Sequence, residues 1–245
     1  MDSGYYAAMS GLVARTQALD TAAANLANVQ TPGYRAEREY FRSVLLGDDS
    51  GDSQLGRVMN NYGMLGGDLL NLAQGAIATT GNPLDVAIQG EGFFQILTAN
   101  GVRFTRDGGF RRSISNQLLT ARGEAVLSST GQAIQLPPGQ VTIGADGVIS
   151  VAGGTVATLG VVTFAKGTRL TPEGGDRYAA PAGVKPVASK MATVRQGAIE
   201  SANEDAIHGS LELIVMQRQA ELMQRALTVF HSEFNKIASE DLPKV

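Results

Sequence analysis

The sequence predicts an α+β protein, in which an N-terminal and a C-terminal helix form a coiled-coil-like helical domain around an inserted all-β domain and an extended connector. Apolar residues recur at alternating steps of three and four near both ends, as in helices that pack lengthwise. Between residues 82 and 194, short strand-like runs alternate with glycine turns. Hydrophobic residues make up 43% of the 245 residues and charged residues 18%, which is typical of a globular chain.

The first helix is expected from about residue 4 to residue 29, with Asp2 or Ser3 as its N-cap. Pro32 and Gly33 end it, because proline disfavours a helical residue before it and glycine opens a turn. The apolar positions of this helix form a narrow series: Tyr5, Met9, Leu12, Thr16, Leu19, Ala23 and Leu26.

The connector covers residues 35–80. Its first part, residues 35–46, fits either a charged helix or an extended arm. Residues 47–67 are rich in Gly, Asp, Ser and Asn and lack periodicity, which is typical of a loop or arm.

The β domain begins near Asn82. Residues 84–88 and 93–97 read as strands, and Asn100-Gly101 predicts a hairpin turn after the second of them. Asp146-Gly147 predicts a second hairpin, between residues 141–143 and 148–151, and residues 156–164 read as one further strand.

The last helix is expected from Ser201, which forms a possible capping box with Glu204, to about residue 239. Its series is Leu213, Met216, Ala220, Met223, Leu227, Phe230, Phe234 and Ile237. The sequence therefore divides into four predicted segments. Residues 1–34 and 198–245 are the two helices of the terminal helical domain, residues 35–80 are the connector, and residues 81–197 are the β-rich domain.

Composition and spacing argue against several functions. The net charge of −3 gives no reason to expect nucleic acid, and no apolar run reaches the ~18 residues of a membrane span. The chain has no cysteine, which excludes disulfides and thiol chemistry. Gly90 and Gly92 precede a strand rather than a helix, so they predict turns and not a nucleotide site. His208 and His231 lack the spacing of a shared metal site. We therefore expect no catalytic, cofactor or metal site.

The apolar series of the two helices and the asparagines at the end of the first helix each allow two interpretations. The apolar series could pack against the chain's own β domain or against neighbouring subunits. Asn25 and Asn28 could end the first helix, or their amides could bind across helices and fix the register of the packing.

Four stretches together resemble the rod and hook subunits of the bacterial flagellum, known as the flagellar axial proteins. They are residues 24–35, residues 74–94, residues 104–110 with Gly123 and 126–127, and Leu213-Ile214 with Gln217-Arg218. The resemblance implies a helical tube in which the terminal helices line the inner wall, with other rod proteins as partners. It also implies location in the basal-body rod of the periplasmic space, after export through the flagellar type III apparatus without a cleaved signal peptide.

Within this family, the chain has room for one outer domain, which favours a rod protein over a hook protein. Residues 219–223 lack the tyrosine and asparagine usual for the distal rod, which favours a proximal rod protein, with a distal rod or hook-type protein as the alternative. The expected assembly interface is Met9, Leu12, Leu19, Asn25, Leu26, Asn28, Leu213, Met216, Met223, Leu227, Phe230, Phe234 and Ile237. An alternative of another class is a secreted β-domain binding module that its helices oligomerise.

Overall fold

A computed structural model of the chain describes residues 2–43, 63–189 and 191–240, without the side chains of residues 2–8, 39–43, 63–68, 230 and 233–240. The chain forms two compact units. The helical unit contains Met1–Leu26, Glu37–Leu69 and Ala206–Val245, and the β unit contains Ala27–Ala36 and Leu70–Asp205. The chain is thus an α+β protein, as its patterning predicts.

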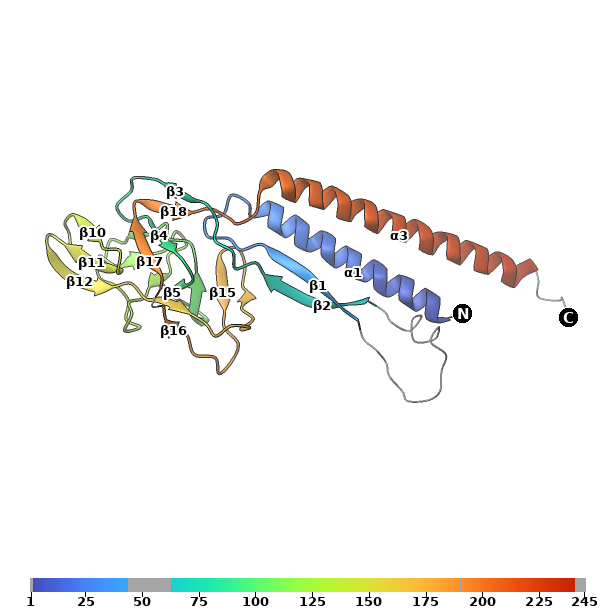
Figure 1. Ribbon diagram of the computed structural model, residues 1–245, viewed down its shortest axis with the longest axis horizontal. Coiled ribbons are helices and arrows are strands. Elements are labelled where there is room, and N and C mark those ends of the chain that lie inside the picture. Colours follow the sequence, from blue (N-terminus) through green and yellow to red (C-terminus); the bar gives the residue numbers. More distant parts are fainter. Residues whose placement is uncertain (1, 44–62, 190, 241–245) are drawn as a thin grey trace. The chain divides into compact units, whose positions relative to one another are not determined.

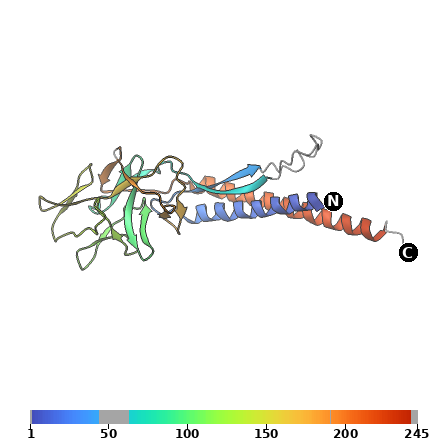
Figure 2. The same cartoon turned by 90° about the horizontal axis from the view of Figure 1, so that it is seen from below.

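In the helical unit, α1 (Asp2–Ala27) and α3 (Ala206–Glu240) lie side by side in both views (Figures 1 and 2). Where they meet, the Met223 methyl carbon lies 3.4 Å from the position that a Cβ on Gly11 would occupy. Coiled-coil winding of the pair stays a prediction.

The predicted start of the last helix at Ser201 is wrong, because α3 begins at Ala206. The reason lies in the hydrogen bonds of the preceding residues. The Ser201 N–H donates to the Ala76 carbonyl at 2.8 Å, and the Asn203 N–H donates to the Tyr34 carbonyl at 3.3 Å. The Ser201 bond continues the antiparallel pairing of residues 198–200 with residues 77–79, and the Asn203 bond keeps the chain on the β unit, so the helix begins only beyond these residues.

The connector forms strands. β1 (Glu37–Ser43) pairs with β2 (Gly63–Leu70) in a two-stranded sheet, so the extended alternative for residues 35–46 is the correct one where the structure describes it. Most of the loop expected over 47–67 lies outside the described residues, and residues 63–67 belong to β2. β3 (Ile77–Thr79) completes this region.

The main sheet of the β unit follows the order β14-β15-β6-β5-β9-β8-β7, and β13 joins β5 to β16. A three-stranded sheet, β10-β11-β12, and the pairs β17-β4 and β18-β3 complete the unit, with antiparallel pairing throughout. The bounds are β4 Val86–Gln89, β5 Phe93–Thr98, β6 Gly101–Thr105, β7 Arg111–Arg112, β8 Leu118–Leu119, β9 Ala125–Val126, β10 Val141–Ile143, β11 Val148–Val151, β12 Gly154–Thr158, β13 Val161–Thr163, β14 Thr171–Pro172, β15 Arg177–Ala179, β16 Val187–Ala188, β17 Thr193–Gln196 and β18 Ala198–Glu200.

Both predicted hairpins are confirmed: β5 turns into β6 at Asn100-Gly101, and β10 into β11 at Asp146-Gly147. The single strand predicted over 156–164 is wrong, because Leu159 and Gly160 separate β12 from β13. Gly160 lies so close to neighbouring main chain that an added Cβ would fall 2.7 Å from the Ser128 carbonyl oxygen. The chain also changes partners at this point, since β12 pairs with β11 and β13 pairs with β5.

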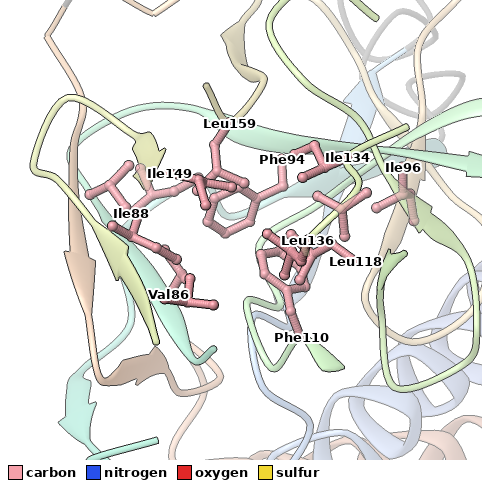
Figure 3. Close-up of a cluster of buried hydrophobic side chains, with 14 of the residues drawn as sticks. Val86, Ile88, Phe94, Ile96, Phe110, Leu118, Ile134, Leu136, Ile149 and Leu159 are labelled. Atoms are coloured by element: carbon pink, nitrogen blue, oxygen red, sulfur yellow. The ribbon is translucent and has the colours of Figure 1, made fainter. Parts of the chain in front are cut away.

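Strand alternation places two apolar clusters on opposite faces of β5. Phe94 and Ile96 point into the larger cluster (Figure 3), which also contains Val86, Ile88, Phe110, Leu118, Val126, Ile134, Leu136, Ile149 and Leu159. Phe93 points the other way, into a smaller cluster with Phe104, Val162, Leu170 and Tyr178. The β unit therefore has apolar packing on both faces of β5.

Candidate assembly faces and a buried junction

The C-terminal apolar series faces the interior of the helical unit. Leu227 is 9% exposed and Ala220 is also buried, while Leu213, Met216 and Met223 are half-buried. The side chains of Phe230, Phe234 and Ile237 lie outside the described part of α3. Sequence spacing thus identified the inner face of α3 where it is described.

A second apolar series lies on the outer side of α3. Its members are all exposed in the single chain, and Leu222 reaches 63% exposure. They are Ile207, Leu211, Ile214, Val215, Leu222 and Val229. A helix that is apolar on two sides has more apolar surface than one partner helix covers.

Where its side chains are described, from residue 9 onward, the inner face of α1 consists mainly of small residues. Ala14, Ala18 and Ala22 are buried, whereas Met9 is exposed and Leu12, Leu19 and Leu26 are half-buried. The predicted N-terminal series is therefore displaced from the face that the chain itself buries. Its role in assembly stays a prediction.

The side chain of Asn25 is buried and binds main-chain groups of β1. Its amide nitrogen donates to the Glu37 carbonyl at 2.8 Å, and its amide oxygen accepts the Glu37 N–H at 2.9 Å. Asn28 lies in the turn that ends α1, where its carbonyl accepts the Thr31 N–H. Asn25 therefore fixes β1 to the end of the helix, a use that neither interpretation included.

Three segments of the β unit cross at a junction, which we define as residues 31–36, 71–76 and 198–203. Asn203 connects all three. Its amide oxygen accepts the Ala36 N–H at 2.8 Å, and its amide nitrogen donates to the carbonyls of Asn71 and Ala73 at 2.6 and 2.9 Å. The Gly33 N–H donates to the Glu200 carbonyl at 2.7 Å. These bonds hold together the segments through which the chain enters and leaves the β unit.

A buried ion cluster lies at the centre of the junction. The Glu200 carboxylate accepts from Arg35 Nη2 at 2.6 Å through one oxygen and from Arg106 Nη1 at 3.0 Å through the other. The first oxygen also accepts the Gly75 N–H at 2.8 Å. All three charged side chains are almost fully buried. Such a cluster is stable only while its partners stay together, because desolvation of an unpaired charge is costly.

Surrounding groups hold the two guanidinium groups in place. Arg106 Nη2 donates to the Gly90 carbonyl at 2.7 Å, and its guanidinium carbon lies 5.4 Å from the centre of the Phe93 ring. Burial lowers the pKa of Arg106, and the charge of Glu200 opposes this shift. The Tyr178 hydroxyl accepts the Arg35 N–H at 2.8 Å, and burial raises the pKa of Tyr178.

Glycines at the junction permit close main-chain contacts. Gly33 has a φ of +70°, and a Cβ there would lie 2.3 Å from the Asp107 nitrogen. A Cβ on Gly75 would lie 2.1 Å from the Ser201 carbonyl oxygen. Gly33 and Gly75 thus permit close packing of the main chain at the junction.

Asp107, whose nitrogen lies near Gly33, is itself perturbed. Burial raises the pKa of Asp107 to about 6, although its carboxylate accepts the Gly109 N–H at 2.9 Å.

Other features of the described chain concern chemistry and membranes. In the described residues, no three His, Asp or Glu side chains are grouped so that they could hold a metal. Over the same part of the chain, neither helix has the apolar length needed to cross a bilayer.

The β unit contains a pocket of about 390 Å³ whose lining residues are all uncharged. They are Ser128, Ser129, Thr130, Gln132, Ala133, Ile134, Gln135, Val156, Ala157 and Thr158.

Comparison with known proteins points to the flagellum. Residues 6–35 match the family described as "Flagella basal body rod protein", and residues 87–151 match "Flagellar hook protein FlgE/F/G D1 domain". The chain is 36% identical over 223 residues to the flagellar basal-body rod protein FlgF of Rhizobium meliloti, with 89% of each chain covered. It belongs to the flagellar basal-body rod protein family.

Further relatives carry the same description. FlgF of Caulobacter vibrioides is 30% identical over the full length of both chains, and FlgG of Bacillus subtilis is 29% identical with more than nine-tenths of each chain covered. This rod protein is a structural subunit of the flagellar basal body. The resemblance inferred from the signature stretches is therefore confirmed.

Sequence reasoning about the rod protein missed the junction. Arg35 and Arg106 lie inside the stretches that resemble the family, so a signal was present, but Glu200 and Asn203 lie outside them. No local pattern pairs Arg35 with Glu200, because they are 165 positions apart.

Proposed function

We propose that this rod protein joins its neighbours through the apolar faces of α1 and α3, while the junction keeps the chain segments of the β unit in fixed register. The observation that carries the proposal is the exposed outer series of α3. Six exposed apolar side chains on one helix favour burial against a neighbour, and each could contribute about 1.5–3 kcal/mol.

The predicted residues keep their proposed role in this scheme. Met9 and the half-buried Leu12, Leu19 and Leu26 would form the contact surface of α1. Phe230, Phe234 and Ile237 would extend the seam of α3, and Leu213, Met216, Met223 and Leu227 would join it as neighbours assemble. We expect amide-exchange protection of residues 213–237 to rise on assembly.

A charge on the outer series tests the proposal. Leu222→Asp should abolish tubes or helical stacks in electron micrographs, and motility in cells, because assembly would bury an unpaired carboxylate. Gln224→Asp is the matched control, since it adds the same charge at another exposed position of α3. Normal motility of the Leu222→Asp strain would contradict the proposal.

A second variant probes the inner series. Leu227→Asp should also stop assembly, and because Leu227 is buried within the helical unit, it should lower helix content in the monomer as well. Residues 82–194 should stay folded in both variants. Discrete small oligomers in place of tubes for the parent protein would favour the binding-module alternative.

We also infer that the subunit belongs to the proximal part of the rod. The departures at residues 219–223 support this position, as does the 36% identity to the R. meliloti FlgF, against 29% to the B. subtilis FlgG. Deletion of the gene should then stop basal-body construction before the distal rod. A complete distal rod in the deletion strain would argue for the distal or hook-type alternative.

Export and the absence of catalysis complete the proposal. Membership of the flagellar rod family supports export through the flagellar type III apparatus into the periplasmic space. The mass of the subunit recovered from basal bodies should therefore show no cleaved N-terminal peptide. We infer a purely structural role, without an enzymatic activity, a cofactor, nucleic-acid binding or membrane insertion.

A further inference from the structure

The junction has little apolar packing of its own. Its buried apolar residues are Tyr34, Ala36 and Ala202, which form a cluster separate from the two larger clusters of the β unit. Two of these three side chains are single methyl groups, so the apolar area that they bury is small. Hydrogen bonds and the buried ion cluster therefore hold most of the junction together. Segments with few buried apolar contacts open at a lower free energy than the core of a protein.

The contacts of the junction join residues that lie far apart along the chain. Glu200 is 165 positions from Arg35 and 94 positions from Arg106, and Asn203 is 167 positions from Ala36. The larger apolar cluster is instead built on hairpins such as β8–β9 and β10–β11, whose strands follow one another directly. Because closing a long loop costs entropy before its contacts form, the hairpins are expected to form before the junction.

The rest of the β unit has contacts that do not depend on the junction. We call residues 84–196, which contain the buried residues of both larger clusters, the body of the β unit. Within the body, Arg106 donates to the Gly90 carbonyl at 2.7 Å and lies over the Phe93 ring. Arg106 therefore keeps two partners when Glu200 is absent.

Gln196 marks the border between the body and the last segment of the junction. Its amide nitrogen donates to the carbonyls of Pro83 and Val141 at 2.7 and 3.0 Å, and its amide oxygen accepts the Ile143 N–H at 3.1 Å. β17, which ends at Gln196, also pairs with β4 along its whole length. The body therefore holds the chain as far as Gln196, and opening can be confined to the residues beyond it.

The charges favour closure of the junction as a whole. When the junction is open, Arg35 and Glu200 are solvated and neither charge carries a desolvation cost. When one of them is buried without the other, that cost is not offset. A partly closed junction is therefore unfavourable, and its three segments are expected to open and close together.

We propose that the junction acts as a latch, which closes after the body of the β unit has folded and opens without unfolding that body. Its three segments follow α1, follow β2 and precede α3. An open junction would give the chain freedom to change direction at these points while neighbouring subunits bind, and closure would remove that freedom. This use of the latch in assembly rests on the proposed function, whereas the order of folding does not.

Refolding and unfolding rates of the full-length chain test the order of events. Glu200→Gln should leave the refolding rate within about twofold of the parent and raise the unfolding rate by roughly 100- to 1,000-fold, because contacts made after the rate-limiting step affect unfolding alone. Val126→Ala, in the fully buried core of the body, should instead slow refolding. Two variants that divide their effects alike between refolding and unfolding would overturn the proposal.

Amide exchange of the parent chain tests the latch without any substitution. The N–H groups of Gly33, Ser201 and Asn203 donate within the junction, and those of Leu118 and Leu136 donate within the body. We expect the junction amides to exchange roughly 100-fold faster than the body amides, since local opening is easier than global unfolding. Low urea should accelerate the body amides but barely change the junction amides, because local opening exposes little surface. Equal rates with equal urea dependence would overturn the proposal.

The role in assembly has its own measurement. Exchange of the Gly33 and Asn203 amides should slow towards the rate of the body amides when the chain assembles. Unchanged exchange in assemblies would overturn this role and leave the helix contacts intact, because Leu222→Asp tests those contacts separately. Loss of the helix contacts would in turn remove the role in assembly, while the folding order would still stand or fall by the two measurements on the monomer.

Discussion

Arg35 and Glu200 form an ion pair of 2.6 Å with no exposed side-chain surface on either residue. The pair links Arg35, in the segment after α1, to Glu200, the last residue of β18. In the sequence, β18 shortly precedes α3. Because Glu200 also binds Arg106, one carboxylate neutralises part of two buried positive charges. The junction therefore depends on this single acidic side chain.

Replacement of that acid should strongly destabilise the β unit. Glu200→Gln leaves two buried guanidinium groups without a counter-charge, so we expect a loss of about 3–5 kcal/mol in the free energy of unfolding. Urea denaturation followed by tyrosine fluorescence measures it, since the chain has no tryptophan. Glu173→Gln is the control: its ion pair with Arg103 is partly exposed to solvent, so a much smaller loss, of about 1 kcal/mol, is expected. Equal losses in the two variants would contradict the role of the junction.

Asp107 should make the stability of the β unit depend on pH. Burial raises its pKa in the folded chain to about 6, from an ordinary value of 3.8. Between these two values the folded state binds more protons than the unfolded state, so the free energy of unfolding falls as the pH rises. Asp107→Asn should therefore be more stable than the parent at pH 7.5, by roughly 1–2 kcal/mol, and the gap should close below pH 4.

The matched control for this pH profile is Asp146→Asn, at the exposed turn between β10 and β11. We expect no comparable pH-dependent gain from it. A constant difference between Asp107→Asn and the parent from pH 4 to pH 8 would show that burial of the carboxylate is not the cause.

Gly33→Ala should test the close contact at the junction. The substitution combines a positive φ with a Cβ placed 2.3 Å from the Asp107 nitrogen. Gly131→Ala separates the two effects, because Gly131 has a φ of +78° but nothing within 4 Å of its Cβ position. We expect Gly131→Ala to lower the free energy of unfolding, measured by thermal denaturation, by about 1–2 kcal/mol, and Gly33→Ala to lower it clearly more. Equal losses would mean that backbone conformation alone matters at Gly33.

Asn25→Ala should release β1 from α1. The change removes two hydrogen bonds to the Glu37 peptide groups, so we expect a loss of about 1–3 kcal/mol in the free energy of unfolding and faster amide exchange at Glu37. Gln17→Ala, at an exposed position of α1, should change neither quantity. Unchanged exchange at Glu37 in Asn25→Ala would refute the anchoring role.

Much of the local structure could be predicted because its signals are local. Asn100-Gly101 and Asp146-Gly147 specify tight turns by their backbone preferences, and alternation along residues 93–97 separates the two core clusters. The three-four spacing of Leu213 to Leu227 identified the inner face of α3. The start of α3 could not be predicted, since hydrogen bonds to distant residues hold 201–203 out of the helix.

The sequence by itself determined the family, the α+β class, the turns and the inner face of α3, because periodicity and turn chemistry act between residues close along the chain. Only the tertiary structure decided that Arg35 meets Glu200, that Asn25 binds Glu37 and that α1 buries its alanines rather than its larger residues. Such pairings depend on which surfaces the folded chain brings together. A charge or an amide carries no information in the sequence about the distant group that will satisfy it.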